Sequence, residues 1–272
     1  MWPGATQPWR NACGKSAEDP DPCRGTEGHA MDFRKALRGF LRWVEDLVYP
    51  RGINCLVCGD RRRTDPATGV CPGCLKKLEA ERVPAAACPR CLSFASRKGC
   101  AFCAAGGMKD VRRAFAPLYY HPASRSLVIS LKFGGTDEAL PLLGEWMADS
   151  LIERDFDYLL PVPLHPRRRR ERGVNQAALL ASEVSRRTGI PMREDLLVRR
   201  KYTRPQTAIS FRKRKSNVLD AFALPPGANV SGMKILLCDD VRTTGNTAQA
   251  CARTLKKAGA ADVCLLTACA VR

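Results

Sequence analysis

Two adjacent carboxylates, Asp239 and Asp240, stand between an apolar run and a turn that is rich in hydroxyl groups and glycine. Carboxylates accept hydrogen bonds from the vicinal hydroxyls of a sugar, and they also lie near magnesium ions. The turn, Thr243–Thr247, supplies hydroxyl donors, and Gly245 lets the backbone approach a bound group closely. Because the start of a helix favours anions, this order of residues predicts a site for a sugar that carries phosphate.

A strand and a helix must position these groups. The apolar residues of Lys234–Cys238 predict a buried strand, and a helix is expected over Thr247–Lys257. A strand end with an acidic turn and an N-capped helix is the simpler alternative. The stretch from Ile235 to Thr247 resembles the signature of type I phosphoribosyltransferases, which bind 5-phosphoribosyl-1-pyrophosphate (PRPP). Arg242 replaces the aliphatic residue usual in that family, and it either adds charge for phosphate or points to solvent.

A second loop is expected beside the first, at Pro161–His165, where the predicted strand Tyr158–Pro163 ends. Five arginines follow this loop, and arginine forks match the oxygen atoms of phosphate. A solvated basic helix end is the alternative, but Arg172–Gln176 contains glycine and asparagine, which favour a shaped turn. The loop is therefore predicted to hold pyrophosphate. The five arginines are Arg167, Arg168, Arg169, Arg170 and Arg172.

The segment Thr203–Gln206 predicts a mobile lid between two sheet elements, and it contains Arg204. A lid of this type excludes water from the reacting atoms. Breaking the bond between ribose C1 and pyrophosphate places negative charge on the leaving group, and a cation stabilises that charge. We therefore predict catalytic roles for Asp239, Asp240 and Arg204.

Positive charge is concentrated around this predicted site. Residues 161–215 contain 16 Lys and Arg but only four Asp and Glu, so they carry +12 of the chain's net +18. A charge of this sign favours polyanionic partners such as nucleotides, pyrophosphate or nucleic acid. Aromatic residues make up only 7% of the chain, and just Tyr202 and Phe211 fall inside the basic stretch, so no platform for stacking bases is evident.

Eight of the 14 cysteines form four Cys-x-x-Cys pairs between residues 55 and 103. Tetrahedral zinc takes four thiolates, and two such pairs supply them. Redox-active pairs are the alternative, but these occur singly beside a βαβ unit. Pairing by sequence order predicts two structural zinc sites without a catalytic role, while interleaved pairing stays open. The two predicted quartets are Cys55, Cys58, Cys71 and Cys74, and then Cys88, Cys91, Cys100 and Cys103.

Composition favours a reducing compartment. Hydrophobic residues make up 45% of the 272 residues, so a core can form without disulfides. No apolar run approaches the roughly 20 residues of a membrane span, and the N-terminus lacks the apolar region of a signal peptide. We therefore expect a cytoplasmic protein with no membrane partner, in which thiols stay reduced. Buried thiols are expected at Cys238, Cys251, Cys264 and Cys269.

Four regions are predicted along the chain. Residues 1–30 are expected to be disordered or to precede a true start at Met31, and residues 31–50 to form an amphipathic helix. Residues 51–108 are expected to form a double zinc ribbon, and residues 109–272 the larger domain. Strands alternate with helices there, which indicates a parallel sheet covered by helices. Its further predicted strands are Ala114–Tyr120, Leu196–Arg200 and Val263–Val271, and its further helices are Ser124–Phe133, Glu138–Glu153 and Val174–Thr188.

Together these features resemble the ComF family, also called ComF/GntX, in which a cysteine ribbon precedes a type I phosphoribosyltransferase-like domain. The resemblance runs from about residue 31 to the C-terminus. It implies structural Zn²⁺, and Mg²⁺ bound together with PRPP. Besides the quartets and the signature, the motifs that carry it are Leu131–Gly134, Pro161–His165, Arg172–Gln176, Arg204–Gln206, Arg214 with Asn217, and Ala221–Phe222.

The resemblance also implies which residues contact PRPP. By analogy with amidophosphoribosyltransferases, Pro163, Leu164 and His165 would hold the pyrophosphate. Members of the family are linked to natural transformation, in which incoming single-stranded DNA is handled in the cytoplasm of competent bacteria. The remaining implied contacts are Asp239, Asp240, Val241, Thr243, Thr244, Gly245, Asn246 and Thr247.

Three functions stay open from the sequence. The first is an enzyme that transfers the phosphoribosyl group from Mg-PRPP to an unknown acceptor. The second is a non-catalytic protein that binds single-stranded DNA and uses PRPP as a regulatory ligand. The third is an adaptor whose ribbons dock a competence helicase. No residue is an obvious base for activating an acceptor, and His121 and His165 are the candidates.

Overall fold

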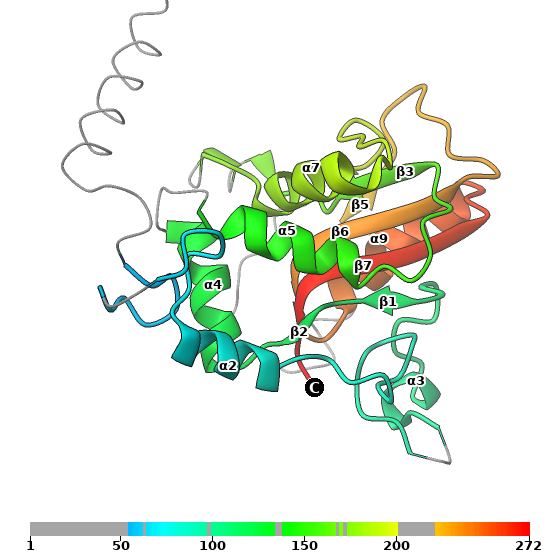
Figure 1. Ribbon diagram of the computed structural model, residues 1–272. Helices are drawn as coiled ribbons and strands as arrows, with labels where there is room; N and C mark the ends of the chain where they lie inside the picture. The colour runs from blue at the N-terminus through cyan, green and yellow to red at the C-terminus, as the bar shows by residue number, and fades with distance from the viewer. Residues whose placement is uncertain are drawn as a thin grey trace, which may run out of the picture. The chain divides into compact units, whose positions relative to one another are not determined.

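A computed structural model of the protein describes residues 54–61, 64–96, 99–133, 138–166, 169–170, 173–200 and 221–272 (Figure 1). All of these residues belong to one compact unit, Tyr49–Arg272. The predictions for residues 1–30, for the helix at 31–50 and for the lid with Arg204 lie outside the described residues. None of the helices in the described part is long and apolar enough to cross a membrane.

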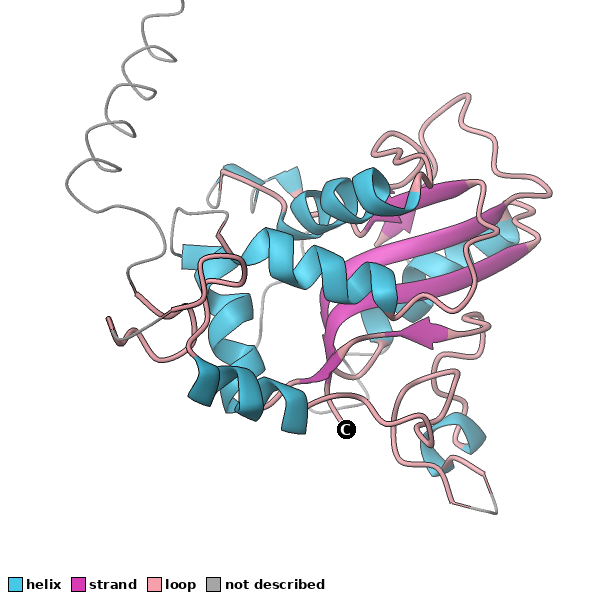
Figure 2. Cartoon of the chain, viewed as in Figure 1, coloured by secondary structure: helices cyan, strands magenta, loops and turns pink. Residues whose placement is uncertain are grey.

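A parallel sheet forms the centre of this unit (Figure 2). Its strands lie in the order β1-β7-β6-β3, and β2 also pairs with β7. The two middle strands are buried on both faces, which explains their nearly continuous apolar sequences. The strands are β1 (Ala114–Phe115), β2 (Leu118–Tyr119), β3 (Tyr158–Pro161), β6 (Lys234–Arg242) and β7 (Asp262–Ala270).

Helices cover both faces of the sheet, as the alternating pattern predicted (Figure 1). One face packs against three helices through a core that includes Leu127, Leu143 and Leu180. Among the described helices, one packs on the opposite face, through Ile235, Leu237 and other apolar side chains. The three helices are α4 (Pro122–Phe133), α5 (Ala139–Asp149) and α7 (Gln176–Thr188), and the single helix is α9 (Asn246–Lys257).

The remaining elements are short. Helix α2 (Pro72–Ala80) begins after Cys71 with a proline in its first turn, where the missing N–H costs nothing. Helix α3 (Ala101–Ala104) begins after Cys100. Strands β4 (Val198–Arg199) and β5 (Phe222–Ala223) pair antiparallel and flank residues 201–220.

Three sequence predictions differ from the structure. The strand predicted at Ala114–Tyr120 is two short strands, because Pro117 has no N–H to donate to a ladder. The strand expected to end at Cys238 continues to Arg242, because β7 extends alongside and pairs with Asp239, Val241 and Arg242 as well. Strand β5 was not predicted, since a strand of two residues has no detectable periodicity.

Candidate functional site

The two predicted loops lie side by side at one edge of the sheet. Strands β3 and β6 are parallel neighbours, with Pro161 opposite Cys238. The backbone N–H of Val162 donates to the carbonyl of Cys238 over 2.8 Å. The residues that follow each strand therefore meet at the carboxyl edge, where parallel sheets bind ligands. This edge brings together the aspartate pair and the loop Pro163–His165.

Both aspartates belong to the last residues of β6 and are partly exposed. The carboxylate of Asp239 accepts the N–H of Asp240 over 2.9 Å, and the carboxylate of Asp240 accepts the N–H of Val241 over 2.7 Å. Each carboxylate is thus oriented by the backbone of the next residue. Partly exposed carboxylate oxygens suit both sugar hydroxyls and magnesium, so the donor set fits Mg²⁺.

The turn after β6 presents its backbone to an incoming anion. Thr243 and Thr244 are exposed. Gly245 has φ +68° and stands at the N-cap of α9, where no described side chain caps the helix. The first N–H groups of a helix lack partners within the helix and favour a negative group. The turn leads from a strand into a helix start, as its sequence predicted, and its binding of an anion stays a prediction.

The glycine is required for a second reason, which the sequence did not reveal. A Cβ atom at Gly245 would lie 2.4 Å from the sulfur of Met108, which is 1% exposed. The next residues of that segment are also attached to α9, because the N–H of Asp110 donates to Oε1 of Gln249 over 3.0 Å. Met108 is 137 residues away in the chain and no periodicity links it to the turn, so sequence reasoning missed this contact.

Arg242 does not point to solvent, and that interpretation was wrong. Its side chain is 4% exposed, and Nη1 donates to the carbonyl of Thr243 over 2.8 Å. Among the described residues, no acceptor lies within reach of its Nε and Nη2. Burial lowers the pKa of Arg242, while the charges of Cys91 and Tyr119 act in the opposite direction. The guanidinium is therefore a buried cation directly behind the turn.

The second loop is held by Asn175. Its Oδ1 accepts the N–H of Ala177 over 3.2 Å and so caps α7, while its Nδ2 donates to the carbonyl of Val162 over 3.2 Å. Gly173, two residues earlier, has φ +75°, a conformation that glycine adopts easily. Gly173, Val174 and Asn175 thus form the defined turn that was predicted, and the side chain of Asn175 holds the end of β3 in place.

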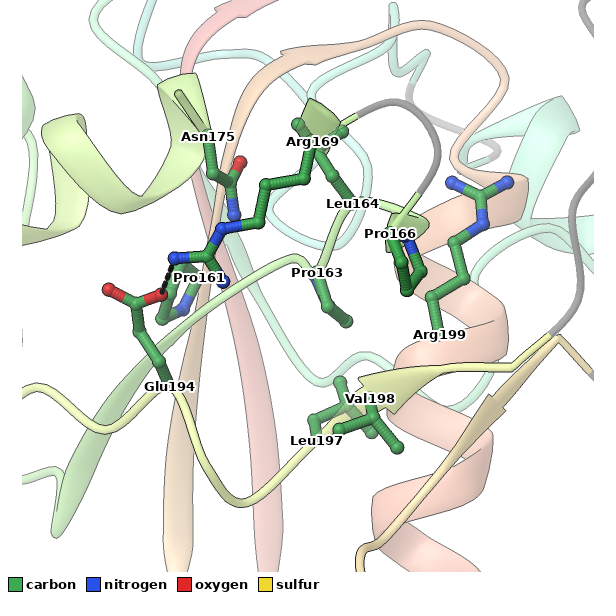
Figure 3. Close-up of a pocket in the computed structure, with 10 residues that line it drawn as sticks. All are labelled: Pro161, Pro163, Leu164, Pro166, Arg169, Asn175, Glu194, Leu197, Val198 and Arg199. Atoms are coloured by element: carbon green, nitrogen blue, oxygen red, sulfur yellow. Dashed lines mark ion pairs between the residues drawn. The ribbon is translucent and has the colours of Figure 1, made fainter. Parts of the chain in front are cut away.

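A cavity of about 290 Å³ opens beside this loop (Figure 3). It is bounded by prolines of the loop and by residues of β4 (Figure 3). Nη2 of Arg169 lies 4.0 Å from Oε2 of Glu194 at one side of the cavity. Of the predicted arginine run, Arg169 and Arg170 are described and exposed, and the other three lie outside the described residues. His165, the last residue of the loop, is partly exposed.

The eight cysteines assemble into two quartets in sequence order, not interleaved. Within each quartet the four sulfur atoms lie within 4.8 Å of one another. The measured separations are 4.0 Å for Cys58–Cys71, 3.8 Å for Cys88–Cys103 and 3.4 Å for Cys91–Cys100. Zinc–sulfur bonds of about 2.3 Å require tetrahedral edges of about 3.8 Å, so both quartets fit a zinc ion.

The four other described cysteines are buried, as the sequence predicted. They are Cys238, Cys251, Cys264 and Cys269. Burial raises the pKa of Cys238 and of Cys251 well above the usual value for a thiol. These thiols are therefore packing residues and not nucleophiles.

Comparisons with known proteins agree with this arrangement. A family profile described as "Phosphoribosyl transferase domain" matches residues 173–272. The DNA utilization protein YhgH of Salmonella typhimurium is 30% identical over 216 residues, which span 77% of this chain and 86% of that protein. Competence protein F of Haemophilus influenzae is 36% identical over 106 residues, which span 39% of this chain and 46% of that protein.

Among solved structures, the glutamine PRPP amidotransferase of B. subtilis aligns with 51% of this chain and 30% of its own. The sequence identity is 19% and the TM-score is 0.35, a similarity too low to carry a functional argument. The parallel sheet, the domain match and the relative that aligns over most of its length lead to one conclusion. The chain belongs to the ComF family and contains a type I phosphoribosyltransferase-like domain.

Proposed function

We propose that this protein binds PRPP together with magnesium at the carboxyl edge of β3 and β6. One observation carries the proposal. The paired aspartates lie near the end of a central strand, which leads through a short turn to an uncapped, glycine-led helix start beside a second backbone loop. PRPP combines vicinal hydroxyls, a phosphate and a pyrophosphate, and this edge offers groups that suit each of them.

Each part of the site has a distinct role in this proposal. Asp239 and Asp240 accept hydrogen bonds from the ribose hydroxyls, and the turn Thr243–Thr247 binds the 5′-phosphate through N–H and hydroxyl donors. The loop Pro163–His165 holds the pyrophosphate. Magnesium, when bound, neutralises charge on the pyrophosphate oxygens. If phosphoribosyl transfer occurs, Arg204 stabilises the leaving group and the cavity beside the loop receives the acceptor.

Calorimetric titration of PRPP with magnesium tests this site. Asp239→Asn combined with Asp240→Asn is expected to abolish saturable binding while the protein stays folded. Asp149→Asn combined with Asp155→Asn changes the charge equally at exposed positions and should leave the affinity unchanged. Unaltered affinity in a folded Asp239/Asp240 double variant would rule out the assignment, and an inert wild-type protein would rule out PRPP binding altogether.

The names of the relatives suggest where such binding is used. They are described as a DNA utilization protein and as competence proteins. We infer that this protein also acts in the uptake or use of DNA. Transfer of a phosphoribosyl group and recognition of PRPP as a signal are both compatible with that setting.

A second candidate is a non-catalytic protein that binds single-stranded DNA under the control of PRPP. The net +12 of residues 161–215 favours it, because phosphate contacts dominate such binding. Fluorescence anisotropy with a labelled oligonucleotide would detect it as salt-sensitive binding that shifts with PRPP. An oligonucleotide affinity that does not change with PRPP, together with turnover of PRPP in the presence of an acceptor, would favour the enzyme instead.

Zinc is proposed as a structural ion in both quartets. A closed site of four thiolates has no open position for a substrate, so it stabilises the fold and takes no chemical step. Elemental analysis of freshly purified protein is expected to find about two zinc ions per chain. Protein without zinc would contradict this assignment.

A further inference from the structure

Arg242 combines deep burial with unused donors. A guanidinium has five N–H groups and stays charged under ordinary conditions. The structure gives this one a single acceptor, the carbonyl of Thr243, and among the described residues no acceptor for Nε or Nη2. A buried charge without a counter-charge is strongly disfavoured. Negative charge on this face of the sheet would therefore stabilise the guanidinium.

The second cysteine quartet is one source of such charge in the same core. Arg242 pairs with Ala270 of β7, and Ala270 lies in the same apolar cluster as Cys88 and Cys91. In their charged form, Cys91, Cys100 and Cys103 favour the charged guanidinium and so raise the pKa of Arg242. Four neutral thiols carry no charge, whereas zinc with four thiolates carries a net charge of about −2. A metal-loaded quartet can therefore balance the arginine, whereas a metal-free quartet of neutral thiols cannot.

The same quartet is joined mechanically to the turn. Met108 follows the last ligand by five residues and lies directly beneath Gly245, where no Cβ atom fits. Asp110 is bonded to Gln249 through both its N–H and its carboxylate. Gln249 in turn donates its own N–H to the carbonyl of Gly245 over 2.8 Å. The chain that leaves the quartet thus contacts the turn and the first turn of α9.

A further contact ties the quartet to the sheet behind the turn. The hydroxyl of Tyr119, on β2, donates to the carbonyl of Leu92 over 3.0 Å, and Leu92 follows a ligand directly. The N–H of Ala114 donates to the carbonyl of Pro89 over 2.8 Å, within the same Cys-x-x-Cys pair. The quartet is therefore fixed against the strands that flank β7.

We propose that the zinc-loaded second quartet is the counter-ion of Arg242 and sets the conformation of the turn Thr243–Thr247. Metal in this quartet then controls how tightly the turn binds an anionic ligand. Metal in the first quartet does not, because that quartet packs on the other face, in the core that contains Leu127 and Trp146. The part of this inference that concerns ligand affinity rests on the proposed binding of PRPP.

Matched variants of the two quartets test the proposal. Cys100→Ser with Cys103→Ser disables the second quartet, and Cys58→Ser with Cys71→Ser disables the first at similarly accessible positions. Each variant should lose one zinc ion. In the second-quartet variant we expect hydrogen exchange of the 243–249 amides to rise by about tenfold or more, and affinity for Mg-PRPP to fall by a similar factor. In the first-quartet variant both should change by less than about twofold.

Arg242→Met tests the electrostatic link without touching a ligand residue. The variant keeps the apolar stem but removes the charge, so a chelator should take zinc from the second quartet several-fold faster than from wild type. Its release from the first quartet should be unchanged. Exchange of the central β6 and β7 amides verifies that each variant is folded.

The possible outcomes are distinct. Unchanged 243–249 exchange after zinc loss from the second quartet, or equal effects from both quartets, would overturn the proposal. Unchanged zinc release in Arg242→Met would remove the counter-ion role. Exchange and zinc release are measured without PRPP, so they still decide the coupling if wild-type protein fails to bind PRPP and the proposed function falls.

Discussion

The two cysteine quartets have the same spacing within their pairs and different surroundings. The first contributes Cys55 and Cys74 to the core that holds α4, α5 and α7. The second contributes Cys88 and Cys91 to the core that contains α9 and the side chains Ile235 and Leu237 of β6. Two ligand sets of the same kind are therefore attached to two different parts of the domain.

This difference separates two roles that a structural metal can have. On the first side the quartet extends an apolar core of helices, so its contribution is stability. On the second side the quartet is packed behind a backbone turn that has the features of an anion site, so a change there reaches the turn. A ligand spacing predicts which metal is bound, but only the packing partners decide what the metal supports.

The largest difference between the two sides should appear in a matched pair of core truncations. Leu78 is fully buried beside the first quartet, and Met108 is almost fully buried beside the second. Leu78→Ala and Met108→Ala should each lower the free energy of unfolding by about 2–5 kcal/mol, because each leaves a cavity. Chemical denaturation measures this cost.

Only the Met108 variant should also weaken binding of Mg-PRPP, because its side chain supports Gly245. Calorimetry on both folded variants separates the two effects. Equal losses of affinity would mean that the turn responds to general destabilisation, and the contrast between the two sides would then disappear.

The parts that the sequence predicted well are those that depend on neighbouring residues. The aspartate pair, the glycine turn, the start of α9 and the ligand spacing of the cysteines are all local patterns. The alternation of strands and helices indicated the parallel sheet for the same reason. Each of these is determined by residues that are close together in the sequence, or by a simple succession of such segments.

The parts that it missed depend on long-range packing. Strand β6 continues through Asp239 and Asp240 because β7 lies alongside, and nothing in the local sequence signals that ladder. Arg242 was expected at the surface or at phosphate because an arginine within a turn motif is usually exposed. Its burial depends on tertiary packing, which the linear sequence does not show.

A smaller effect is expected at Gly245. Gly245→Ala places a methyl group against the sulfur of Met108 and requires a positive φ, so it should cost about 1–3 kcal/mol of stability. Gly232→Ala is the control, because Gly232 has φ +73° but nothing within 4 Å of the added atom. It should cost about 1 kcal/mol from backbone strain alone.

The Gly245 variant should also lose affinity for PRPP, whereas the Gly232 variant should keep it. Thermal denaturation and calorimetry measure the two quantities. If the two glycine variants behave alike, the contact with Met108 has no effect on the turn. The second quartet then does not influence the site through this packing contact.

The other loop of the site offers a variant that is independent of both quartets. Asn175→Ala removes the cap of α7 and the donor to Val162, which should cost about 1–2 kcal/mol. Asn175→Asp keeps the capping oxygen but loses the donor. If the donor positions the pyrophosphate loop, the Asp variant keeps most of the stability and still binds PRPP more weakly, as calorimetry would detect.

The smallest effect is expected at Arg82, on the side of the first quartet. Its guanidinium lies 3.9 Å from the ring centre of Trp146 and forms an ion pair with Glu79 at 3.2 Å. Both partners of the ion pair are partly exposed, so Arg82→Met should cost at most about 1 kcal/mol, and less at high salt. Affinity for PRPP and zinc release from the second quartet should both match wild type.

Arg82→Met and Arg242→Met are the same chemical change on opposite faces of one sheet. Arg82 is balanced by a carboxylate and a ring, so its loss leaves no buried charge behind. Loss of Arg242 leaves the thiolates of the second quartet without their counter-charge. If zinc release and ligand affinity respond to both variants equally, the charge at position 242 has no special connection to the metal, and the two quartets differ only in the core that they extend.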